Sequence, residues 1–474
     1  MDDRPERIGP ASGSQAQLLV PPLRSRVAAA GALAAGVGSA IALAVFAVRD
    51  LAFVLTSLLA LALSISAWWI AFTHRGLRWL SGTIAVLLAA IAVAALVATE
   101  RRALWLLPAI VGIAAAILLG MLALRWEIRA YLEARWDRVA PTERGVLLIN
   151  PKSNNGRALR THLPDEARRR GIEVVLLEPG NDLGALAEAA AARGADALGM
   201  AGGDGPQAIV ASVAASHGLP FVCIPAGTRN HFALDLGVDR KDPVRALDAF
   251  GPAKECAIDL AEVNGEPFVN NVSLGLYAHF VASPEYRDAK RRTVAEMVPE
   301  LLGPGAPSFG LHVERDGEPI SDPQLVVVSN NPYTLSSLAG FGSRARLDTG
   351  ALGVATVTIS RTADVDRLVA LEASGHPERF GGWREWRTPA LVVGGPPSLA
   401  AAVDGEARTW DPPLRFTTRP SALRVRIGLD QTGASPALVQ IPLAMSTFVG
   451  LARVVAGRSS GIVAEASQVA HDRT

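Results

Sequence analysis

The stretch GVLLINPKSNNGR, residues 145–157, decides the fold, because a short apolar run leads directly into turn-forming and polar residues. Such a run predicts a buried β-strand, and the Asn, Pro, Ser and Gly residues after it predict a loop at the strand's carboxyl end. The pattern recurs twice. An apolar run at 197–201 precedes GGDG at 202–205, and another at 221–224 precedes PAGTRN at 225–230.

Helical patterns separate these strands. Residues 173–177 form a further apolar run, and alanine-rich segments at 187–193 and 208–216 predict helices. Alternating strands and helices are typical of an α/β domain with a mostly parallel sheet, in which ligands bind at the carboxyl ends of the strands. The three loops fall at that edge, so we expect a binding site there.

The three loops combine glycine with hydrogen-bonding side chains. Glycine lets backbone N–H groups approach phosphate oxygens, and a helix N-terminus adds partial positive charge. Lys152 and Arg157 could neutralise phosphate charge, and Asp204 offers the oxygen ligands that Mg²⁺ prefers. One such loop alone is equally compatible with an ordinary glycine-rich turn, but three in succession favour a nucleotide site. The sequence contains no GxxxxGK(S/T) motif and no GxGxxG after the first strand, which disfavours a dinucleotide dehydrogenase.

The first quarter of the chain contains four apolar blocks. Residues 27–48, 51–72, 79–98 and 103–124 include no charged residue, and each block has about the 20 residues that cross a hydrocarbon core. Half of all residues are hydrophobic and the mean hydropathy is +0.26, so we expect a four-helix transmembrane module over 27–125. A signal peptide over the first block is the weaker alternative, because no clear cleavage site follows it.

Basic residues flank these blocks unevenly. They gather in the N-terminal tail, in the link after the second block and behind the fourth block: Arg4, Arg7, Arg24, Arg26, Arg75, Arg78, Arg125, Arg129, Arg135 and Arg138. We therefore expect a chain that is integral to the cell membrane. By the positive-inside rule, both termini and the catalytic domains are expected in the cytoplasm. A net charge of +1 gives no electrostatic case for nucleic acid, and two cysteines make no disulfide framework.

From residue 257 onward β-type runs predominate, at 257–263, 325–329, 354–360, 390–393 and 423–427. Three dipeptides predict hairpin turns between runs: Asn264-Gly265, Asp316-Gly317 and Asp404-Gly405. The local sequence leaves two interpretations of Asp404 open, a turn residue or a functional carboxylate. A helix is expected at 442–456, and the basic run at 287–292 is either a solvated helix face or a contact with anionic headgroups.

Seven segments, in order along residues 145–428, resemble the diacylglycerol kinase catalytic domain family, which includes bacterial lipid kinases, sphingosine kinases and ceramide kinases. They are NPKSNNGRA, GGDG, IPAGTRNHFALDLG, FVNNVSLGLYA, SNNPY, LDTGALGV and VDGE. GGDG alone would also suit NAD kinases. The resemblance implies a nucleotide-binding α/β domain, a β-sandwich-like second domain, and an active site in the cleft between them.

The resemblance also implies roles for individual residues. Together with Lys152, the loop residues expected to bind ATP are Asn150, Ser153, Gly156, Gly202, Gly203, Asp204, Gly205, Gly227, Thr228 and Asn230. Those expected to hold Mg²⁺ are Asp204, Asp259 and Asp348. Asp404 and Glu406 match the family's DGE motif, which makes Asp404 the expected general base for a lipid hydroxyl.

Three positions depart from the family pattern. Pro206 replaces a threonine after GGDG, His231 replaces an aspartate after Asn230, and Thr349 replaces the second aspartate of a DDG turn. Proline suits a helix start, but histidine is a poor Mg²⁺ ligand. The leading hypothesis is an ATP-dependent lipid kinase acting on a hydroxyl such as that of diacylglycerol. The alternative is a catalytically impaired nucleotide-binding membrane sensor or scaffold, and the four spans disfavour a soluble acceptor such as NAD.

Six segments are expected along the chain: a cytoplasmic tail at 1–26, the transmembrane module at 27–125, a linker helix at 126–143, the nucleotide-binding domain at 144–256, the β-rich lipid-substrate domain at 257–430, and a C-terminal helix and tail at 431–474. The fold class is therefore an α-helical membrane module plus a two-domain diacylglycerol kinase-like fold. A membrane lipid and the bilayer are the expected partners, and a homodimer is left open.

Overall fold

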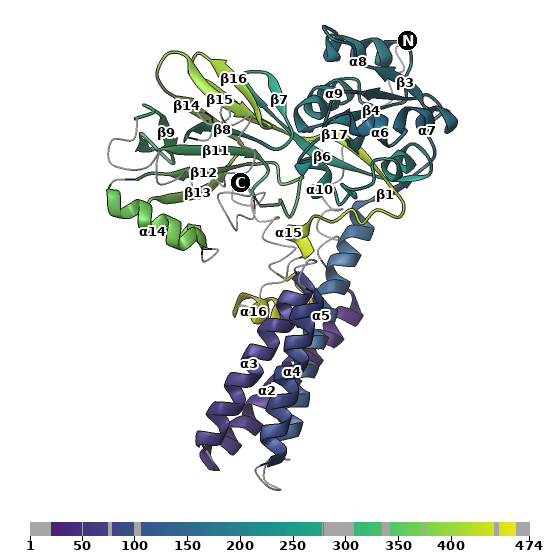
Figure 1. Ribbon diagram of the computed structural model, residues 1–474. Helices are drawn as coiled ribbons and strands as arrows, with labels where there is room; N and C mark the ends of the chain where they lie inside the picture. The colour runs from purple at the N-terminus through teal and green to yellow at the C-terminus, as the bar shows by residue number, and fades with distance from the viewer. Residues whose placement is uncertain are drawn as a thin grey trace, which may run out of the picture. The chain divides into compact units, whose positions relative to one another are not determined.

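A computed structural model describes residues 20–49, 51–73, 78–98, 106–276, 278, 308–333, 342–359, 361–373, 376–439 and 445–460. The chain divides into two compact units, Met1–Ala134 with Gln440–Thr474, and Arg135–Val439. Figure 1 labels most of the helices and strands of both. The basic run at 287–292 lies outside the described residues.

The first unit is helical. Its elements are α2 (Leu23–Arg49), α3 (Leu51–Thr73), α4 (Arg78–Ala98), α5 (Leu107–Arg135), which ends at the unit boundary, and α16 (Met445–Val455). Each of the four expected apolar blocks therefore lies mainly in a helix. Among the described residues two helices are long and apolar enough to cross a membrane, Leu23–Val45 and Leu107–Arg135.

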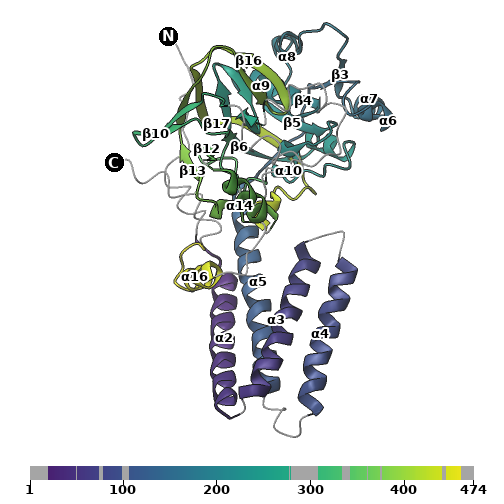
Figure 2. The same ribbon diagram turned by 60° about the vertical axis from the view of Figure 1, so that its left-hand side comes forward.

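Small residues let these helices approach one another closely. A Cβ added at Gly112 of α5 would overlap the Oγ of Ser39 on α2, so a larger residue there would have to displace the Ser39 hydroxyl. Helices α3 and α4 run side by side (Figure 2), and the Ser64 hydroxyl donates across them to the Ala85 carbonyl at 2.9 Å. Close small-residue packing and interhelical hydrogen bonds are the contacts that join helices in lipid.

The second unit contains a large mixed sheet. Its parallel part has the order β5-β4-β2-β3, from β2 (Gly145–Ile149), β3 (Glu173–Leu176), β4 (Ala197–Gly202) and β5 (Pro220–Pro225). Every residue of β2, β4 and β5 is buried, as their apolar sequences predict. The helices are α6 (Arg157–Arg160), α7 (Leu163–Arg169), α8 (Leu183–Ala192), α9 (Asp204–Ser216) and α10 (His231–Asp235). The α/β fold predicted for this segment is confirmed.

One long strand, β17 (Leu414–Gly428), carries this sheet into the β-rich part. It pairs in parallel with β5 and antiparallel with β6 (Ala253–Val263) and β14 (Ala390–Gly394). Its register shifts between Arg419 and Leu423. The sheet therefore runs without a break past residue 257, and the α/β and β-rich parts belong to one compact unit.

The linker helix expected over 126–143 is shorter than the sequence suggests. Helix α5 ends at Arg135, and β1 (Asp137–Val139) pairs with β6 instead. The buried Trp136 lies between them and donates its Nε1–H to the Gly433 carbonyl at 3.2 Å. Burial of this ring on the sheet accounts for the end of the helix.

A second sheet has the order β13-β12-β11-β8-β15-β16. The remaining elements of the unit are β7 (Glu266–Phe268), β8 (Asn271–Gly275), β9 (His312–Arg315), β10 (Glu318–Ser321), β11 (Leu325–Asn330), β12 (Leu352–Val357), β13 (Trp383–Thr388), β15 (Leu399–Val403), β16 (Glu406–Trp410), α14 (Thr362–Ala373), α15 (Pro436–Val439) and two 3₁₀ turns, Arg245–Phe250 and Pro377–Arg379. Strands of both sheets supply one hydrophobic core, in which Phe268, Val328 and Phe416 are fully buried.

The three predicted hairpin turns are present in this β-rich part. Asn264, Asp316 and Asp404 adopt left-handed conformations, with φ of 50°, 52° and 48°, and a left-handed glycine follows each. They join β6 to β7, β9 to β10, and β15 to β16. Such paired positive φ values are what two-residue hairpin turns of this type require.

Candidate active site

The loop after β2 is held by its own asparagine. Asn150 Oδ1 accepts the Lys152 N–H at 3.0 Å, and the Asn150 carbonyl accepts the Ser153 N–H at 3.2 Å. Gly156 ends the loop in a left-handed conformation, φ 72°, and caps α6. Polar side-chain bonding within the loop thus fixes its backbone, as expected for an Asn-Pro-rich turn.

The two basic side chains of this loop differ in availability. Arg157 donates from Nη2 to the carbonyls of Arg240 and Lys241, at 2.8 Å each, so it holds a neighbouring loop in place. Lys152 is exposed. Of the two charges that the sequence offers to phosphate, Lys152 is therefore the one directed to solvent.

The three glycine-containing loops meet at the sheet edge. A Cβ added at Gly227, after β5, would lie 2.4 Å from the Cα of Gly203, after β4. Asn154 of the first loop donates to the Gly227 carbonyl at 3.2 Å. The Asn230 side chain closes on Gly227 through both its oxygen and its nitrogen, at 2.8 Å each, and Thr228 between them is exposed. The predicted convergence of the loops is present.

Asp204 stands at the first position of α9, directly after the buried Gly202 and the half-buried Gly203. Its carboxylate accepts the backbone N–H groups of His231 and Phe232 at 3.0 and 3.3 Å, which ties the start of α9 to the start of α10. Burial raises the pKa of this carboxyl above its usual value. Pro206 occupies the third position of α9 and leaves the helix start intact.

His231 fills the position where the family pattern has an aspartate. Burial, together with the positive charges of Arg229, Arg240 and Arg344, lowers the pKa of its imidazole to about 4. The ring is therefore neutral at physiological pH. Its Nδ1 is buried and has no hydrogen-bond partner within the described part of the chain.

Asp404 lies in the β15–β16 turn with its carboxylate directed inward. The two oxygens accept three backbone N–H groups, from Val269 at 2.9 Å, Asn270 at 2.8 Å and Asn271 at 3.1 Å. Burial and then the negative charge of Asp204 raise the pKa of Asp404 to about 7. The turn and the functional interpretations of Asp404 are thus compatible, because one residue makes the hairpin and presents a perturbed carboxyl.

Glu406 lies against the first turn of α9. A Cβ added at Gly205 would be 2.8 Å from the Glu406 Oε1, so a larger residue there would have to displace this carboxylate. Arg408 donates to the exposed Glu406 at 3.2 Å and to Glu266 at 3.0 Å. The structure therefore brings Asp204, Gly205 and Glu406 together with Asp404, although they come from sequence positions about 200 residues apart.

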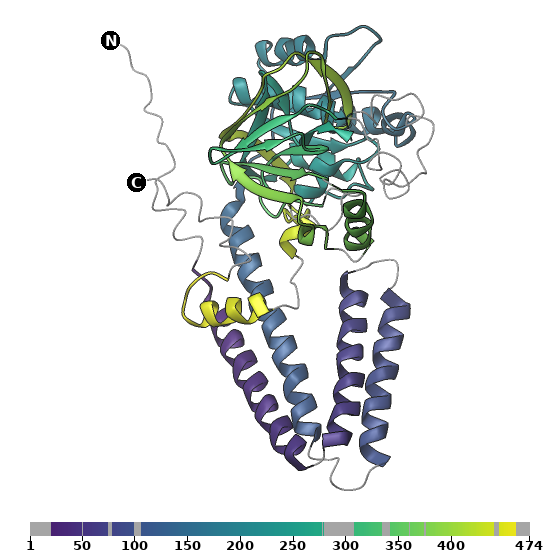
Figure 3. The ribbon, with the colours of Figure 1, turned by 90° about the vertical axis from the view of Figure 1, so that its left-hand side faces the viewer.

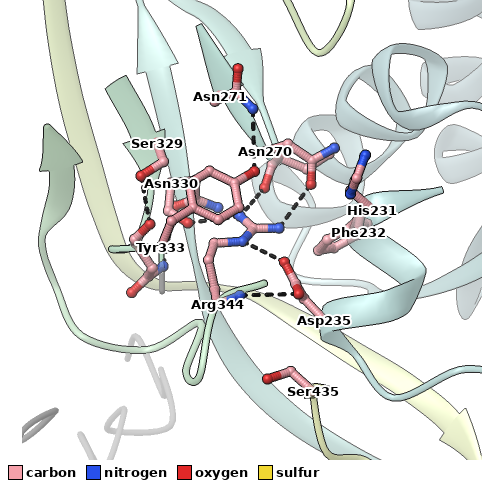
Figure 4. Close-up of polar contacts among 12 residues, drawn as sticks. His231, Phe232, Asp235, Asn270, Asn271, Ser329, Asn330, Tyr333, Arg344 and Ser435 are labelled. Carbon is pink, nitrogen blue, oxygen red and sulfur yellow. Dashed lines mark hydrogen bonds and ion pairs between the residues drawn. The ribbon is translucent and has the colours of Figure 1, made fainter. Parts of the chain in front are cut away.

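Arg344 is the largest fully buried side chain of the described residues and organises this region (Figure 4). Its Nε donates to Asp235 of α10 at 2.6 Å, and its Nη2 donates to Asn270 Oδ1 at 2.8 Å. Its Nη1 donates to the carbonyls of Val269 and Asn330. One guanidinium thus joins α10 to the 269–271 backbone that holds Asp404.

Asp259 and Asp348 have a different environment. The Asp259 oxygens accept the N–H groups of Gly350 at 2.7 Å and Ser421 at 2.9 Å, and the residue is 1% exposed. Asp348 forms ion pairs with Arg346 at 2.7 Å and Arg135 at 3.4 Å. Burial alone would raise the pKa of Asp348, but the two arginines hold it below its usual value.

The three aspartates expected to bind Mg²⁺ are therefore not gathered around one point. Asp259 and Asp348 neighbour each other, whereas Asp204 neighbours Asp404. In the ranges that the structure describes, no group of three or more His, Cys, Asp or Glu side chains is placed to hold a metal ion. Backbone N–H groups and arginines already occupy the oxygens of the Asp259–Asp348 pair, and its role in metal binding stays a prediction.

Comparison with known proteins shows which family one part of the chain matches. Residues 144–263 match the family model named "Diacylglycerol kinase catalytic domain". This part of the chain belongs to the diacylglycerol kinase catalytic domain family. A diacylglycerol kinase of Mycobacterium tuberculosis is 35% identical over 123 residues, 25% of this chain and 40% of the relative. A Pseudomonas fluorescens protein named as a probable lipid kinase, YegS-like, is 29% identical over 308 residues, 60% of this chain and 96% of the relative.

A solved structure shares the fold. A candidate diacylglycerol kinase of Bacillus anthracis superposes with a TM-score of 0.50 at 18% identity, covering 62% of this chain and 98% of that one. The alignment with the first curated relatives spans 40% of their length.

Within this domain, sequence reasoning missed Arg344 and its partners Asp235, Asn270 and Asn330. Arg344 lies in a segment with no strand or helix pattern, and Asp235 ends a short helix between apolar residues. The one usable signal was a charged residue, Asp235, within the apolar run FALDLG, because a buried charge requires a partner. Nothing in the sequence identifies that partner as a residue 109 positions away.

Proposed function

We propose that this chain is a membrane-bound lipid kinase, which transfers the γ-phosphoryl group of ATP to the hydroxyl of a lipid such as diacylglycerol. The observation that carries the proposal is Asp404, a carboxyl with a pKa of about 7 beside Asp204 at the edge where the glycine loops meet. The names of the relatives support a lipid acceptor.

The three loops would bind the ATP phosphates. Glycines at 202, 203 and 227 place no side chain between the loop backbone and a phosphate group, and the α9 N-terminus adds partial positive charge. Lys152 supplies a full charge at the same edge. Arg157 and Asn154 act indirectly, because their bonds to neighbouring carbonyls hold the loops at the spacing that the phosphates would meet.

Kinases of this kind use a divalent metal with ATP, and the residues at the loop edge fit one. Asp204 and Asp404 are neighbouring carboxyls whose pKa values are both raised, so a cation would relieve an electrostatic conflict there. Asp204 would hold the ion through oxygen lone pairs left by its two N–H bonds. When bound, Mg²⁺ would neutralise charge on the transferred phosphoryl group.

Asp404 would act as the general base. A carboxylate with a pKa near neutrality is both partly ionised and basic enough to accept a proton from an alcohol. As the lipid oxygen bonds to the γ-phosphorus, its proton passes to Asp404 and the bond to the β-phosphate oxygen breaks, releasing ADP. The N–H groups of Val269, Asn270 and Asn271 fix the carboxylate in position, and Arg344 fixes that backbone.

The helical unit would place the enzyme at its substrate. Two described helices have the length and apolar composition of spans, and α3 and α4 follow the same sequence pattern. Arginines gather in the N-terminal tail, in the link after α3 and behind the apolar part of α5. By the positive-inside rule, this distribution supports a cytoplasmic location for both termini and the catalytic unit. ATP is then available on the side where the kinase unit lies.

A second candidate function is a nucleotide-binding membrane sensor without turnover. The observation that favours it is His231, a neutral ring with an unpartnered Nδ1 where the family pattern has a carboxylate. The sensor binds ATP without consuming it. Changing His231→Asp and Pro206→Thr together would then create activity, whereas an active kinase adapted to these residues would lose it.

The test is lipid mass spectrometry. Purified full-length chain is incubated with ATP, Mg²⁺ and a panel of lipid alcohols in mixed micelles, and each lipid is examined for one added phosphoryl group. The proposal expects one lipid class to gain it, with ADP formed in equal amount. ATP binding with no phosphorylated lipid from any alcohol would favour the sensor, and absence of ATP binding would contradict both functions.

A further inference from the structure

The helical unit contains an apolar cavity of about 460 Å³ between α2, α3, α5 and α16. Its lining includes Gly36 and Ala40 of α2, Trp69 of α3, Ala116 of α5 and Phe448 of α16. All of the lining side chains are uncharged. Cavities of roughly 300–1,000 Å³ with mostly apolar walls are the usual size for binding one small molecule.

The cavity is shaped by small residues between two tight helix contacts. On one side Gly112 meets Ser39, and on the other Gly120 faces Leu451 of α16, whose Cδ1 would lie 3.2 Å from an added Cβ. Between these contacts Gly36 and Ala116 face each other with no large side chain to fill the space. The space is therefore a consequence of the packing of α2 against α5.

Helix α16 forms one edge of the cavity. Leu451 and Val454 are buried in a cluster with Ala28, Ala29 and Leu124, and Figure 3 shows α16 lying across α2 and α5. Phe448 lines the cavity yet is 55% exposed. Because the Phe448 ring both lines the cavity and is exposed, the cavity opens to the surface of the unit beside this ring.

Positive charge gathers at the same end of the unit. Arg26 Nη2 donates to the Val455 carbonyl at 3.5 Å, and the Arg24 guanidinium lies 5.7 Å from the Trp126 ring centroid. Arg453 is half-buried and Arg458 is exposed just beyond α16. The nearby buried carboxylate of Glu127 accepts three hydrogen bonds of 2.6–2.9 Å from Ser459 and Ser460. Donors of the chain itself therefore occupy this carboxylate.

We propose that this cavity binds one acyl chain of an anionic phospholipid, with the lipid phosphate among the arginines near α16. The inference rests on the proposed placement of the helical unit in a bilayer. In a bilayer, acyl chains surround the helices and are the apolar groups that can enter a cavity opening on the side of the unit. A cluster of arginines at the membrane surface attracts the lipid phosphate. The site is distinct from the acceptor site at Asp404, which lies in the other compact unit.

Photolabelling of the full-length chain tests the site. The protein is reconstituted in phosphatidylcholine vesicles that contain a small fraction of phosphatidylglycerol with a diazirine on one acyl chain, and labelled residues are mapped by mass spectrometry. Labelling is expected to concentrate at Trp69 and Met121 of the cavity, over Val111 and Leu118, which are 59% and 60% exposed on α5.

Filling the cavity supplies the matched comparison. Gly36→Leu places a side chain in the space facing Ala116, whereas Gly38→Leu places it where no atom lies within 4 Å. Cavity labelling is expected to fall about tenfold in Gly36→Leu, equivalent to ~1.4 kcal/mol of binding free energy, and to stay unchanged in Gly38→Leu. Ala116→Leu fills the same space from α5 and guards against a misfolded first variant.

Each outcome decides one part of the inference. Equal labelling of cavity and exposed positions, or equal labelling of both leucine variants, overturns the site. Equal cavity labelling by phosphatidylcholine that carries the same diazirine chain overturns the anionic preference. Absence of label from every helix overturns the bilayer placement as well. Labelling does not require phosphoryl transfer, so a catalytically inactive chain would leave this test intact.

Discussion

Two pairs of aspartates in the same compact unit show how differently one residue type can be used. Asp204 and Asp404 neighbour each other at the loop edge, and burial raises the pKa of both. Asp348 lies between two arginines, which lower its pKa, and Asp259 beside it is closed off by backbone N–H groups. All four stand in segments that resemble one family's motifs.

The difference teaches that the partner of a carboxylate decides its role. A buried carboxylate without an arginine bonded to it keeps free lone pairs, and burial raises its pKa more than N–H bonds lower it, which suits proton transfer and metal binding. A carboxylate paired with guanidinium groups is fixed as an anion and serves as a structural contact. The contrast is therefore sharpest between Asp404 and Asp348, and we expect chemistry from the first and a structural contact from the second. Asp259 shares with Asp404 the backbone N–H bonds and a pKa that burial raises.

The largest expected effect comes from Asp404→Asn. Loss of a general base slows proton transfer by about 10²–10⁴-fold, so the rate of lipid phosphorylation should fall by that factor. Asp348→Asn is the matched control and should lose far less of the rate, because arginines hold the Asp348 carboxylate as a structural contact and it accepts no proton. Similar losses in both variants would erase the distinction between the two pairs.

Arg344→Met should cost the most stability. The change leaves the fully buried carboxylate of Asp235 without its ion-pair partner, and breaking a buried pair in this way costs about 3–5 kcal/mol. Arg193→Met removes an exposed pair with Glu173 and should cost about 1 kcal/mol or less. Thermal unfolding of the full-length chain in detergent compares the two, and equal shifts in Tm would show that Arg344 does not organise the site.

Gly227→Ala should have an intermediate effect on the loop edge. The new Cβ would lie 2.4 Å from the Gly203 Cα, and backbone cannot move away as a flexible side chain can. We expect a loss of about 1–3 kcal/mol of stability and weaker ATP binding. The control is Gly381→Ala, where no atom lies within 4 Å of the added Cβ. If calorimetry shows unchanged ATP affinity in Gly227→Ala, the loop that contains Gly227 does not bind the nucleotide.

Much of the fold was predictable from local pattern. The runs that became β2, β4 and β5 are fully buried, and the loops after them converge as parallel strands require. The hairpin dipeptides were equally direct, because few residues tolerate positive φ. The end of α5 was not predictable, since it depends on Trp136 packing against a segment about 300 residues later.

The sequence supplies candidate residues for the site, but it does not show which of them lie together. Motifs identified Asp204, Asp404, Asp259 and Asp348 as candidates, but a linear pattern does not report which arginine will lie beside which carboxylate. Arg135 and Arg346 convert Asp348 into a structural anion. These pairings depend on long-range strand register, so they emerge only from the folded chain.

The smallest expected effect is also the most direct test of the central claim, that Asp404 acts as a base with a raised pKa. Only the ionised carboxylate accepts a proton, so kcat/KM for ATP should rise about tenfold per pH unit below about 7 and level off above it. The residual activity of Asp404→Asn should lack this rise, and Asp348→Asn should retain it. The same rise in Asp404→Asn, or its absence from the unaltered protein, would contradict the account.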